Sequence, residues 1–298
     1  MIKGSSQAAA QALEARADEF LNGPANDAQM PGGPEPGFGP AIYGYASASD
    51  PIWAEIKKAV HPESWTPLEA FKLAYPAETG LAAEELGVMV FVVPQTEATR
   101  RDQRAVRDFP CERWVRARYL GQPRVVDGLA RHLLGYLQGQ GVQALSPDHL
   151  PGFGHLAHTG PWGYASQWSW RHAAFAAGLG TFGLCDGLIT PVGKSVRIGS
   201  LVIRLELPVT PRPYTDFREY CLFYSSGVCG RCIKRCPLEA ISPKGHDKTI
   251  CAPWTLETSR ERIAATWPDL KGAYSCGLCQ VGVPCEKGIP PRPKPKVG

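Results

Sequence analysis

Eight of the ten cysteines in the chain fall between positions 221 and 285. Thiolates are soft ligands for iron and zinc, so this density indicates metal binding before it indicates disulfides in an intracellular protein. Eight thiolates divide into two sets of four, which is the number of ligands that two [4Fe–4S] clusters require.

The spacing of these cysteines resembles that of a bacterial ferredoxin. Two residues separate Cys229 from Cys232, three separate Cys232 from Cys236, and a proline follows. The last cysteine of such a run ligates the other cluster in two-cluster ferredoxins. The spacing therefore predicts a first cysteine set and a second cysteine set. The first set is Cys221, Cys229, Cys232 and Cys285, and the second is Cys236, Cys251, Cys276 and Cys279.

Two departures from the ferredoxin spacing fall on the first set. Seven residues separate Cys221 from Cys229, and a proline stands before Cys285 instead of after it. Two zinc sites of four cysteines each are an alternative interpretation, although a cysteine–proline step after three residues is not typical of zinc ribbons. Disulfides are a further alternative. Cys111 and Cys185 lie outside the pattern and are expected to be small buried side chains.

The charge of the chain is uneven. The whole sequence has a net charge of +4, which is too weak to indicate a nucleic-acid binder. Residues 212–298 carry 14 Lys or Arg against 8 Asp or Glu, and the rest of the chain carries 18 against 20. The basic segment could offset the charge of thiolate-bound clusters, attract an acidic electron donor or RNA, or be an ordinary solvated surface.

Nothing in the sequence indicates a membrane or secreted protein. No apolar stretch approaches the roughly 20 residues that span a bilayer, and the N-terminus shows neither an apolar signal core nor a twin-arginine pair. We therefore expect a cytoplasmic protein that makes no contact with a membrane.

Several elements must position these cysteines. Apolar periodicity predicts helices over 7–21, 51–59, 100–120, 124–139 and 170–177. It predicts strands over 86–94, 142–145, 187–191 and 195–207, and an extended loop over 22–40. The order of helices and strands favours an α/β layered domain over 1–211. Prolines near position 211 mark a boundary, after which 212–298 form a cysteine-rich domain with a flexible basic tail.

Two further segments could contact a ligand. Gly178, Gly180 and Gly183 satisfy a G-x-G-x-x-G pattern, but a helix precedes them where a nucleotide site needs a strand, so we interpret them as a glycine turn at a helix end. The densest aromatic patch lies just before this turn. It forms either a core anchor or the wall of a pocket for a large flat cofactor. Its members are Trp162, Tyr164, Trp168 and Trp170.

The segments RHAAFAAGLGTFG and LCDGLITPVGKSVRIGSLVI, followed by the eight cysteines, resemble the cobalamin-dependent iron–sulfur reductases. This family comprises epoxyqueuosine reductases and reductive dehalogenases, and the resemblance covers about residues 85–285. It implies a nitroreductase-like α/β (α+β) domain that holds cobalamin, followed by a bacterial two-cluster ferredoxin-like module. It also implies the cysteine partition given above. The residues we expect near the corrinoid are Trp162, Tyr164, Gly178, Gly180 and Arg197.

The resemblance also implies a proton donor. Epoxyqueuosine reductases place an Asp about fourteen residues before the Gly-Leu-Gly turn, and the same count here ends at Tyr164. Dehalogenases use a Tyr acid beside a basic residue. We therefore expect Tyr164 to act as the general acid with Arg197 as the neighbouring cation, because a phenol has a pKa near 10 in water. His158 and His172 are alternatives that more often have structural roles.

These features predict a reductase that receives electrons from a ferredoxin or flavodoxin and passes them through two clusters to a corrinoid. The substrate is a small molecule or a nucleoside, and epoxyqueuosine reduction is the closest named activity. The charge does not support tRNA binding, and the helical-repeat tail of many epoxyqueuosine reductases is absent from this sequence. One alternative is an electron-transfer or corrinoid-reducing protein without its own substrate. Another is a flavin in place of the corrinoid.

Overall fold

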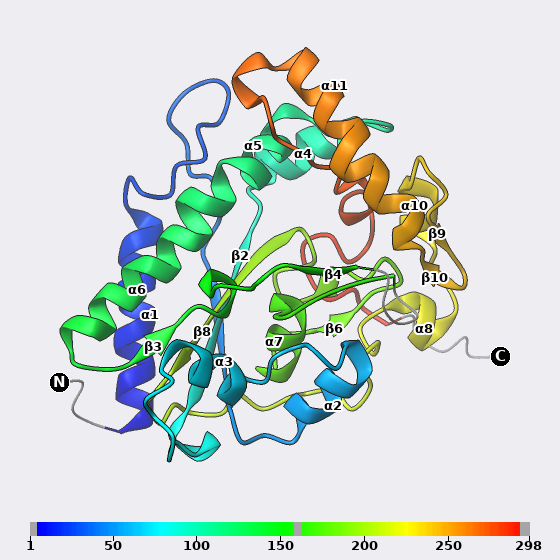
Figure 1. Ribbon diagram of the computed structural model, residues 1–298. Helices are drawn as coiled ribbons and strands as arrows, with labels where there is room; N and C mark the ends of the chain where they lie inside the picture. Colours follow the sequence, from blue (N-terminus) through cyan, green and yellow to red (C-terminus); the bar gives the residue numbers. More distant parts are fainter. Residues whose placement is uncertain (1–4, 158–162, 293–298) are drawn as a thin grey trace.

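The structure is a computed structural model that describes residues 5–157 and 163–292. Its centre is a four-stranded sheet in the order β1–β2–β8–β3, in which every neighbouring pair is antiparallel (Figure 1). The strands are β1 (Ile42–Ser47), β2 (Gly87–Pro94), β8 (Val196–Ile203) and β3 (Ala144–Leu145). Among the described helices, none is long and apolar enough to cross a membrane.

Strand β2 is buried at every position, as the continuous apolar run over 86–94 predicts. It lies between β1 and β8, and helices cover both faces of the sheet. Successive side chains of a strand point to opposite faces. Met89 and Phe91 therefore belong to one core cluster, whereas Val88 and Val90 belong to the other.

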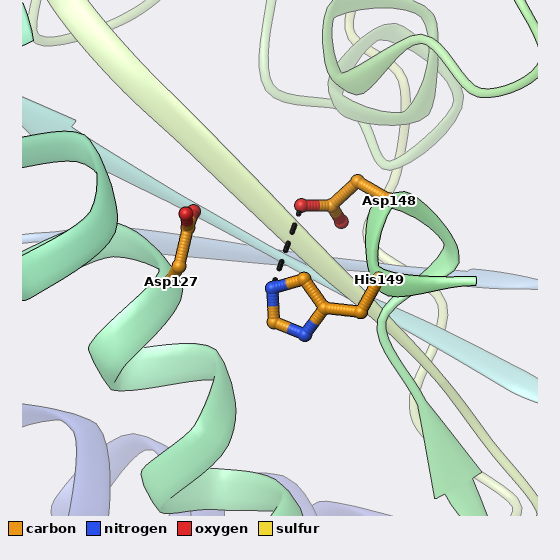
Figure 2. Close-up of side chains that lie close together, drawn as sticks. All are labelled: Asp127, Asp148 and His149. Carbon is orange, nitrogen blue, oxygen red and sulfur yellow. Dashed lines mark ion pairs between the residues drawn. The ribbon is translucent and has the colours of Figure 1, made fainter. Parts of the chain in front are cut away.

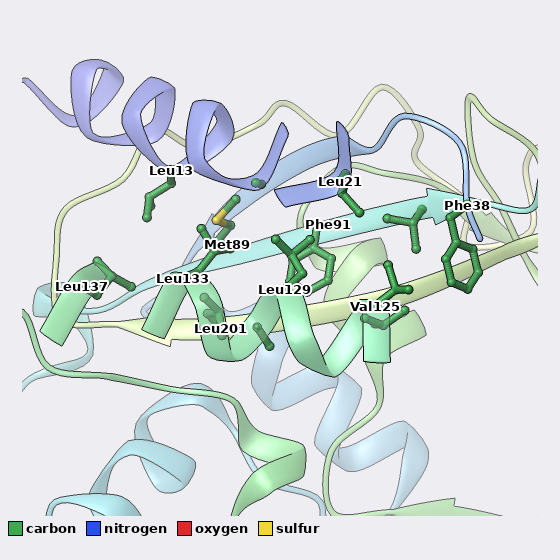
Figure 3. Packing of buried hydrophobic residues seen from close by; sticks show 14 of the residues in the cluster. Leu13, Leu21, Phe38, Met89, Phe91, Val125, Leu129, Leu133, Leu137 and Leu201 are labelled. Carbon is green, nitrogen blue, oxygen red and sulfur yellow. The ribbon is translucent and has the colours of Figure 1, made fainter. Parts of the chain in front are cut away.

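Helices α1 (Ser6–Asn22) and α6 (Asp127–Gly139) cover the first face. The side chain of Ser5 accepts a hydrogen bond from the backbone N–H of Ala8 and so caps α1. Figure 3 shows Leu13 of α1 and Leu133 of α6 pointing toward Met89 of the sheet. Removing a buried leucine of this kind typically costs about 2–5 kcal/mol, so this layer holds the N-terminal helix firmly on the sheet.

Helices α2 (Ile52–Val60), α3 (Pro67–Ala74) and α7 (Trp170–Ala176) contribute to the core on the second face. The ring of Trp168 stacks on that of Trp53 with centroids 5.7 Å apart. Its indole N–H donates to the hydroxyl oxygen of Ser200 on β8 at 2.8 Å. Trp168 is therefore a core anchor that fixes the start of α7 to the sheet.

Three of the differences between the structure and the sequence prediction have a clear physical cause. The helix expected over 100–120 is two helices, α4 (Glu97–Ala105) and α5 (Glu112–Tyr119), because Pro110 cannot continue the helical hydrogen bonds. Helix α6 begins only after a wide turn over Gln122–Val126. Strand β1 was not predicted, because small and polar residues interrupt its apolar pattern.

The remaining short elements surround the sheet ends. Three hairpins pair β4 (His155–Ala157) with β5 (Tyr164–Ser166), β6 (Thr181–Phe182) with β7 (Leu188–Ile189), and β9 (Ile241–Ser242) with β10 (Gly245–His246). Single turns lie at η1 (Ala83–Glu85), η3 (Pro147–His149), η5 (Pro268–Leu270) and η6 (Leu278–Gln280).

The cysteine-rich segment forms helices α8 (Leu222–Ser226), α9 (Arg231–Arg235), α10 (Lys248–Pro253) and α11 (Ser259–Thr266), with a wide turn over Trp254–Thr258. Figure 1 shows α11 lying over α4 and α5. There Ile263 and Leu270 share a buried cluster with Val115 of α5. The last third of the chain is thus packed on the first part through apolar contacts.

Candidate functional site

The four members of the first cysteine set line one cavity. Cys221 precedes α8, Cys229 lies in the loop after it, Cys232 is in α9, and Cys285 comes from the chain's last described loop. The wall also contains Lys194, from the turn before β8. The structure thus brings Cys285 to three thiols that lie much earlier in the sequence.

The second cysteine set lies close together as well. Burial, together with the neighbouring Cys251 and Cys236, raises the pKa of the Cys276 thiol to about 12. Cys279 also lies near Cys276. A buried thiol binds metal only after losing its proton, so metal binding and deprotonation are coupled here.

Backbone contacts fix both sets to the first part of the chain. The side-chain amide of Gln103 in α4 donates to the carbonyl oxygen of Cys276 at 2.8 Å. The backbone N–H of Lys194 donates to the carbonyl oxygen of Cys285 at 3.0 Å. Arg235 donates to the carbonyl oxygens of Gln103 and Val106. These contacts join α4 and the start of β8 to the cysteine loops.

Cys185 is buried, as expected, but it also lies among the metal-binding candidates. It shares an apolar cluster with cysteines of both sets, and hydrogen bonds with Cys232 and Cys279 lower the pKa of its thiol. The ammonium of Lys194 donates to the Sγ atom of Cys185 at 3.1 Å, and Lys194 is only 3% exposed. Spacing reasoning missed both residues because they lie outside the cysteine-rich stretch.

A charged network faces Cys251. Burial lowers the pKa of His246, but the carboxylate of Asp186 and the thiol of Cys251 raise it to about 9. The Nδ1 atom of His246 lies 3.3 Å from Asp186, whose other partner is Lys248 at 3.5 Å. Burial opposes ionisation of Cys251, yet His246 outweighs burial and lowers the pKa of that thiol. The thiolate, which is the metal-binding form, is therefore favoured at this position.

The two glycines expected near a cofactor form a tightly packed turn. Gly178 ends α7 with a φ of 75°, and a Cβ there would lie 2.6 Å from the carbonyl oxygen of Pro211. A Cβ on Gly180 would lie 2.2 Å from the carbonyl oxygen of Ile189. Both glycines approach the chain's own backbone, so their geometry supports the glycine turn.

Gly180→Ala is expected to lower the free energy of unfolding of the cofactor-free protein by about 3 kcal/mol, because the new methyl group overlaps the backbone of Ile189. Urea unfolding would measure the loss. Gly135→Ala is the matched control, since nothing lies within 4 Å of the Cβ that it adds on α6. Unchanged stability of Gly180→Ala with weaker cofactor binding would instead support the cofactor role.

The expected proton donor and its expected cation lie on two strands, Tyr164 in β5 and Arg197 in β8. Tyr164 lies in β5, directly after Gly163. A Cβ added to Gly163 would lie 3.4 Å from the side chain of Thr249 in α10, so this part of the hairpin is next to α10. Burial and the charge of Arg118 lower the pKa of Arg197 to about 9, and the other residue that acts on it is Tyr274. Tyr274 is thus one phenol that acts on Arg197, and it also accepts a hydrogen bond from Arg118 at 3.2 Å.

The rest of the aromatic patch has mixed roles. Trp162 and His158 lie outside the described residues. Trp170 packs on Phe153 with ring centroids 5.8 Å apart, and its buried indole nitrogen has no hydrogen-bond partner within the described part of the chain. Of the two tryptophans of this patch that the structure describes, Trp168 uses its indole N–H within the core, whereas the indole N–H of Trp170 could donate to a ligand.

His172 is a structural histidine. Its Nδ1 atom lies 2.7 Å from the hydroxyl of Ser169, and its ring lies against that of Phe182. Burial, followed by the charges of Arg171 and Lys248, lowers its pKa to about 3. The ring is consequently neutral in the folded protein at physiological pH.

The low pKa of His172 predicts acid sensitivity. Its pKa in the unfolded chain is about 6.5, so below that pH the unfolded state binds a proton that the folded state does not. The free energy of unfolding should therefore fall by about 1 kcal/mol per pH unit as the pH drops below about 6.5. Urea unfolding at several pH values should show a shallower slope for His172→Gln, whereas His61→Gln should keep the slope of the original protein.

A cluster of three ionisable residues lies near the start of α6. Asp127, Asp148 and His149 have ligand-type atoms within 4.8 Å of one another, and Figure 2 shows the ion pair between Asp148 and His149. Burial raises the pKa of Asp127, and Asp148 adds to the rise. The side-chain amide of Gln122 donates to Asp127 at 2.9 Å, and the hydroxyl of Ser146 donates to Asp148 at 2.6 Å. These contacts give the two carboxylates partners within the fold.

The fold is that of a mixed α/β protein with a central antiparallel sheet, and solved structures share it. No protein-family model matches the sequence, and no curated protein matches it. The chain is similar to the catabolic reductive dehalogenase NpRdhA, with a TM-score of 0.56 and 15% identity over 96% of this chain and 33% of that chain. It is also similar to a reductive dehalogenase whose structure suggests a mechanism for B12-dependent dehalogenation. The TM-score there is 0.50, with 15% identity over 90% of this chain and 36% of that chain.

A weaker likeness is to epoxyqueuosine reductase from Bacillus subtilis, with a TM-score of 0.46 and 16% identity over 84% of this chain and 62% of that chain. This chain spans about a third of the length of the dehalogenase chains that it matches. The likeness to the dehalogenases confirms the expected α/β fold and supports the family resemblance at the level of the fold.

Proposed function

We propose that this chain is an iron–sulfur reductase that uses cobalamin. In this proposal two [4Fe–4S] clusters carry electrons to a corrinoid beside the sheet, and a small-molecule or nucleoside-type substrate is reduced there. The observation that carries the proposal is the gathering of eight cysteines into two groups against a fold shared with reductive dehalogenases.

The donor chemistry of both sets fits iron–sulfur clusters. All ten cysteines are free thiols, so no pair of the eight candidate ligands is joined in a disulfide. Cys221 and Cys232 are nearly buried, and apolar side chains such as Phe223 line the cavity of the first set. A nearly dry, all-thiolate site suits iron–sulfur ligation, and Cys236 is followed by the proline typical of ferredoxins.

Unpaired polar groups near the sheet fit a corrinoid. Within the described residues, the buried side-chain amide of Gln95, the Nε atom of Arg197 and the indole nitrogen of Trp170 lack hydrogen-bond partners. Buried polar groups are normally paired, so such groups are where a polar ligand is expected. These three residues would hold the amide side chains of the corrinoid, which when bound supplies low-potential cobalt chemistry to the substrate.

Tyr164 is our proposed proton donor in this reductase. Its β4–β5 hairpin lies beside α10, which carries Cys251 of the second set. Tyr164→Phe removes only the hydroxyl and should lower substrate turnover by about a hundredfold, because a positioned acid contributes 10²–10⁴-fold. Single-turnover rates would measure this, with Tyr136→Phe as the control. Full turnover in Tyr164→Phe would remove Tyr164 from the role.

One observation favours the alternative function of an electron-transfer or corrinoid-reducing protein. Burial and the charge of Arg118 lower the pKa of Arg197, the cation expected beside Tyr164, to about 9, which weakens its hold on a proton. In that alternative the chain would reduce a corrinoid and hand it to another protein. Stoichiometric transfer of reduced cobalamin without substrate turnover would support it.

An EPR experiment tests the proposal. The protein is reconstituted anaerobically with iron and sulfide and mixed with cob(II)alamin, and spectra are recorded before and after dithionite. We expect a base-off cob(II)alamin signal and, after reduction, signals of [4Fe–4S] clusters. Cluster signals with cobalamin still base-on would contradict the corrinoid part of the proposal. Flavin fluorescence released on denaturation would point to the flavin alternative.

A further inference from the structure

The first cysteine set has two deeply buried and two less buried members. Cys221 and Cys232 are each 8% exposed, whereas Cys229 and Cys285 are half-buried. Cys229 lines the inner cavity of the set and also a second, open groove on the outside. An electron that arrives in this groove is therefore separated from the proposed first cluster by a single ligand residue.

The walls of this groove, which we call the entry groove, are mainly apolar. Leu222, Val228, Val283 and Pro284 line it, and Val228 is 62% exposed. The groove has a volume of about 560 Å³. The groove therefore presents apolar side chains to solvent directly beside Cys229.

The accessible charge of the entry groove is positive. Arg231 is exposed, and within the described residues it forms no ion pair. Lys234, three residues later on α9, is also exposed. The acid in the lining, Glu286, is 5% exposed and paired with Arg104. A partner that fits this groove has a small apolar contact area with acidic side chains around it.

We propose that the entry groove is the docking site of an acidic ferredoxin that delivers electrons to the first cluster through Cys229. The inference rests on the proposed function, because it needs a cluster on the first set. Opposite charges speed the encounter of electron-transfer partners, and weak apolar contacts let them separate after transfer.

Stopped-flow reduction tests the inference. The reconstituted protein is mixed with reduced acidic ferredoxin at low ionic strength, and the bleaching of its clusters is followed. Arg231→Glu should lower the second-order rate constant about tenfold, and the deficit should shrink as salt is added. Val228→Asp should also slow the reaction. Arg231→Lys keeps the charge, and Lys72→Glu on α3 reverses an exposed charge away from the groove, so both should react at the original rate.

The controls separate failure of this inference from failure of the proposed function. Dithionite is small and needs no docking surface, so it should reduce every variant equally. Equal rates with ferredoxin for Arg231→Glu and the original protein would overturn the inference while leaving the clusters in place. Absence of any reducible cluster in the original protein would overturn the proposed function and this inference with it. If Arg231→Glu slows the reaction with ferredoxin equally at low and high salt, that result would also contradict electrostatic docking.

Discussion

Cys285→Ala is expected to lose about half of the bound iron and to keep the cluster on the second set, because each [4Fe–4S] cluster needs four thiolates. Cys236→Ala should show the reverse, with the first cluster kept. These two cysteines give the sharpest test of how the eight thiols divide into two sets. Cys236 is close in sequence to ligands of the first set but is assigned to the second, and Cys285 is close to ligands of the second set but is assigned to the first. Iron and sulfide analysis with EPR of the reduced protein would measure both results.

The control for this pair is Cys111→Ala, which should bind as much iron as the original protein. Cys185 requires a second comparison, since it packs among the thiols of both sets and could replace a missing ligand. If Cys285→Ala retains both clusters, the double variant Cys185→Ala/Cys285→Ala should lose one of them. Full iron content in the double variant would contradict the ligand role of Cys285.

Lys194→Met is expected to lower the reduction potential of the first cluster. Lys194 lines the cavity of the first set, and its ammonium also lies near Cys232, Cys279 and Cys285. A buried positive charge favours the reduced cluster, which carries one more negative charge. A tenfold change in the ratio of oxidised to reduced cluster corresponds to about 59 mV for a one-electron couple. We expect a shift of about this size, measured by EPR-monitored redox titration.

Lys194→Arg keeps the positive charge and should leave the potential close to its original value. Iron content and thermal unfolding of both variants separate an electrostatic effect from loss of the fold. A potential that stays unchanged in Lys194→Met, with both clusters present, would show that this lysine does not tune them.

Local patterns predicted the elements that carry strong periodicity. Strand β2 and helix α1 each have an unbroken apolar pattern, and the structure confirms both. Strand β1 could not be predicted in the same way, because its position depends on contacts with the rest of the fold. A side chain at Gly44, for example, would clash with the carbonyl oxygen of Ala177, which is far away in the sequence.

In the site, too, some residues could be predicted from the sequence and others could not. Cysteine spacing predicted which thiols belong together, since ligands of one cluster must converge on it. Spacing carries no information about Lys194 or Cys185, because the turn before β8 and the β6–β7 hairpin bring them to the thiols from outside the cysteine-rich stretch. The pairing of Tyr164 with Arg197 came from counting along the chain. In the structure these residues lie on different elements, and the neighbours of Arg197 come from α5 and from the loop before Cys276.

The bonds that join α4 and the start of β8 to the cysteine loops also bear on how the protein is made. Arg235 uses carbonyl groups of α4, and Cys285 is held by the backbone of Lys194. The turn at Gly193, with a φ of 85°, lies directly against Glu286 and has no room for a side chain. During synthesis the ribosome therefore releases the surface that holds the cysteine loops before it releases the loops themselves. For the proposed clusters, insertion would then be a late step that acts on a chain whose sheet can already have formed.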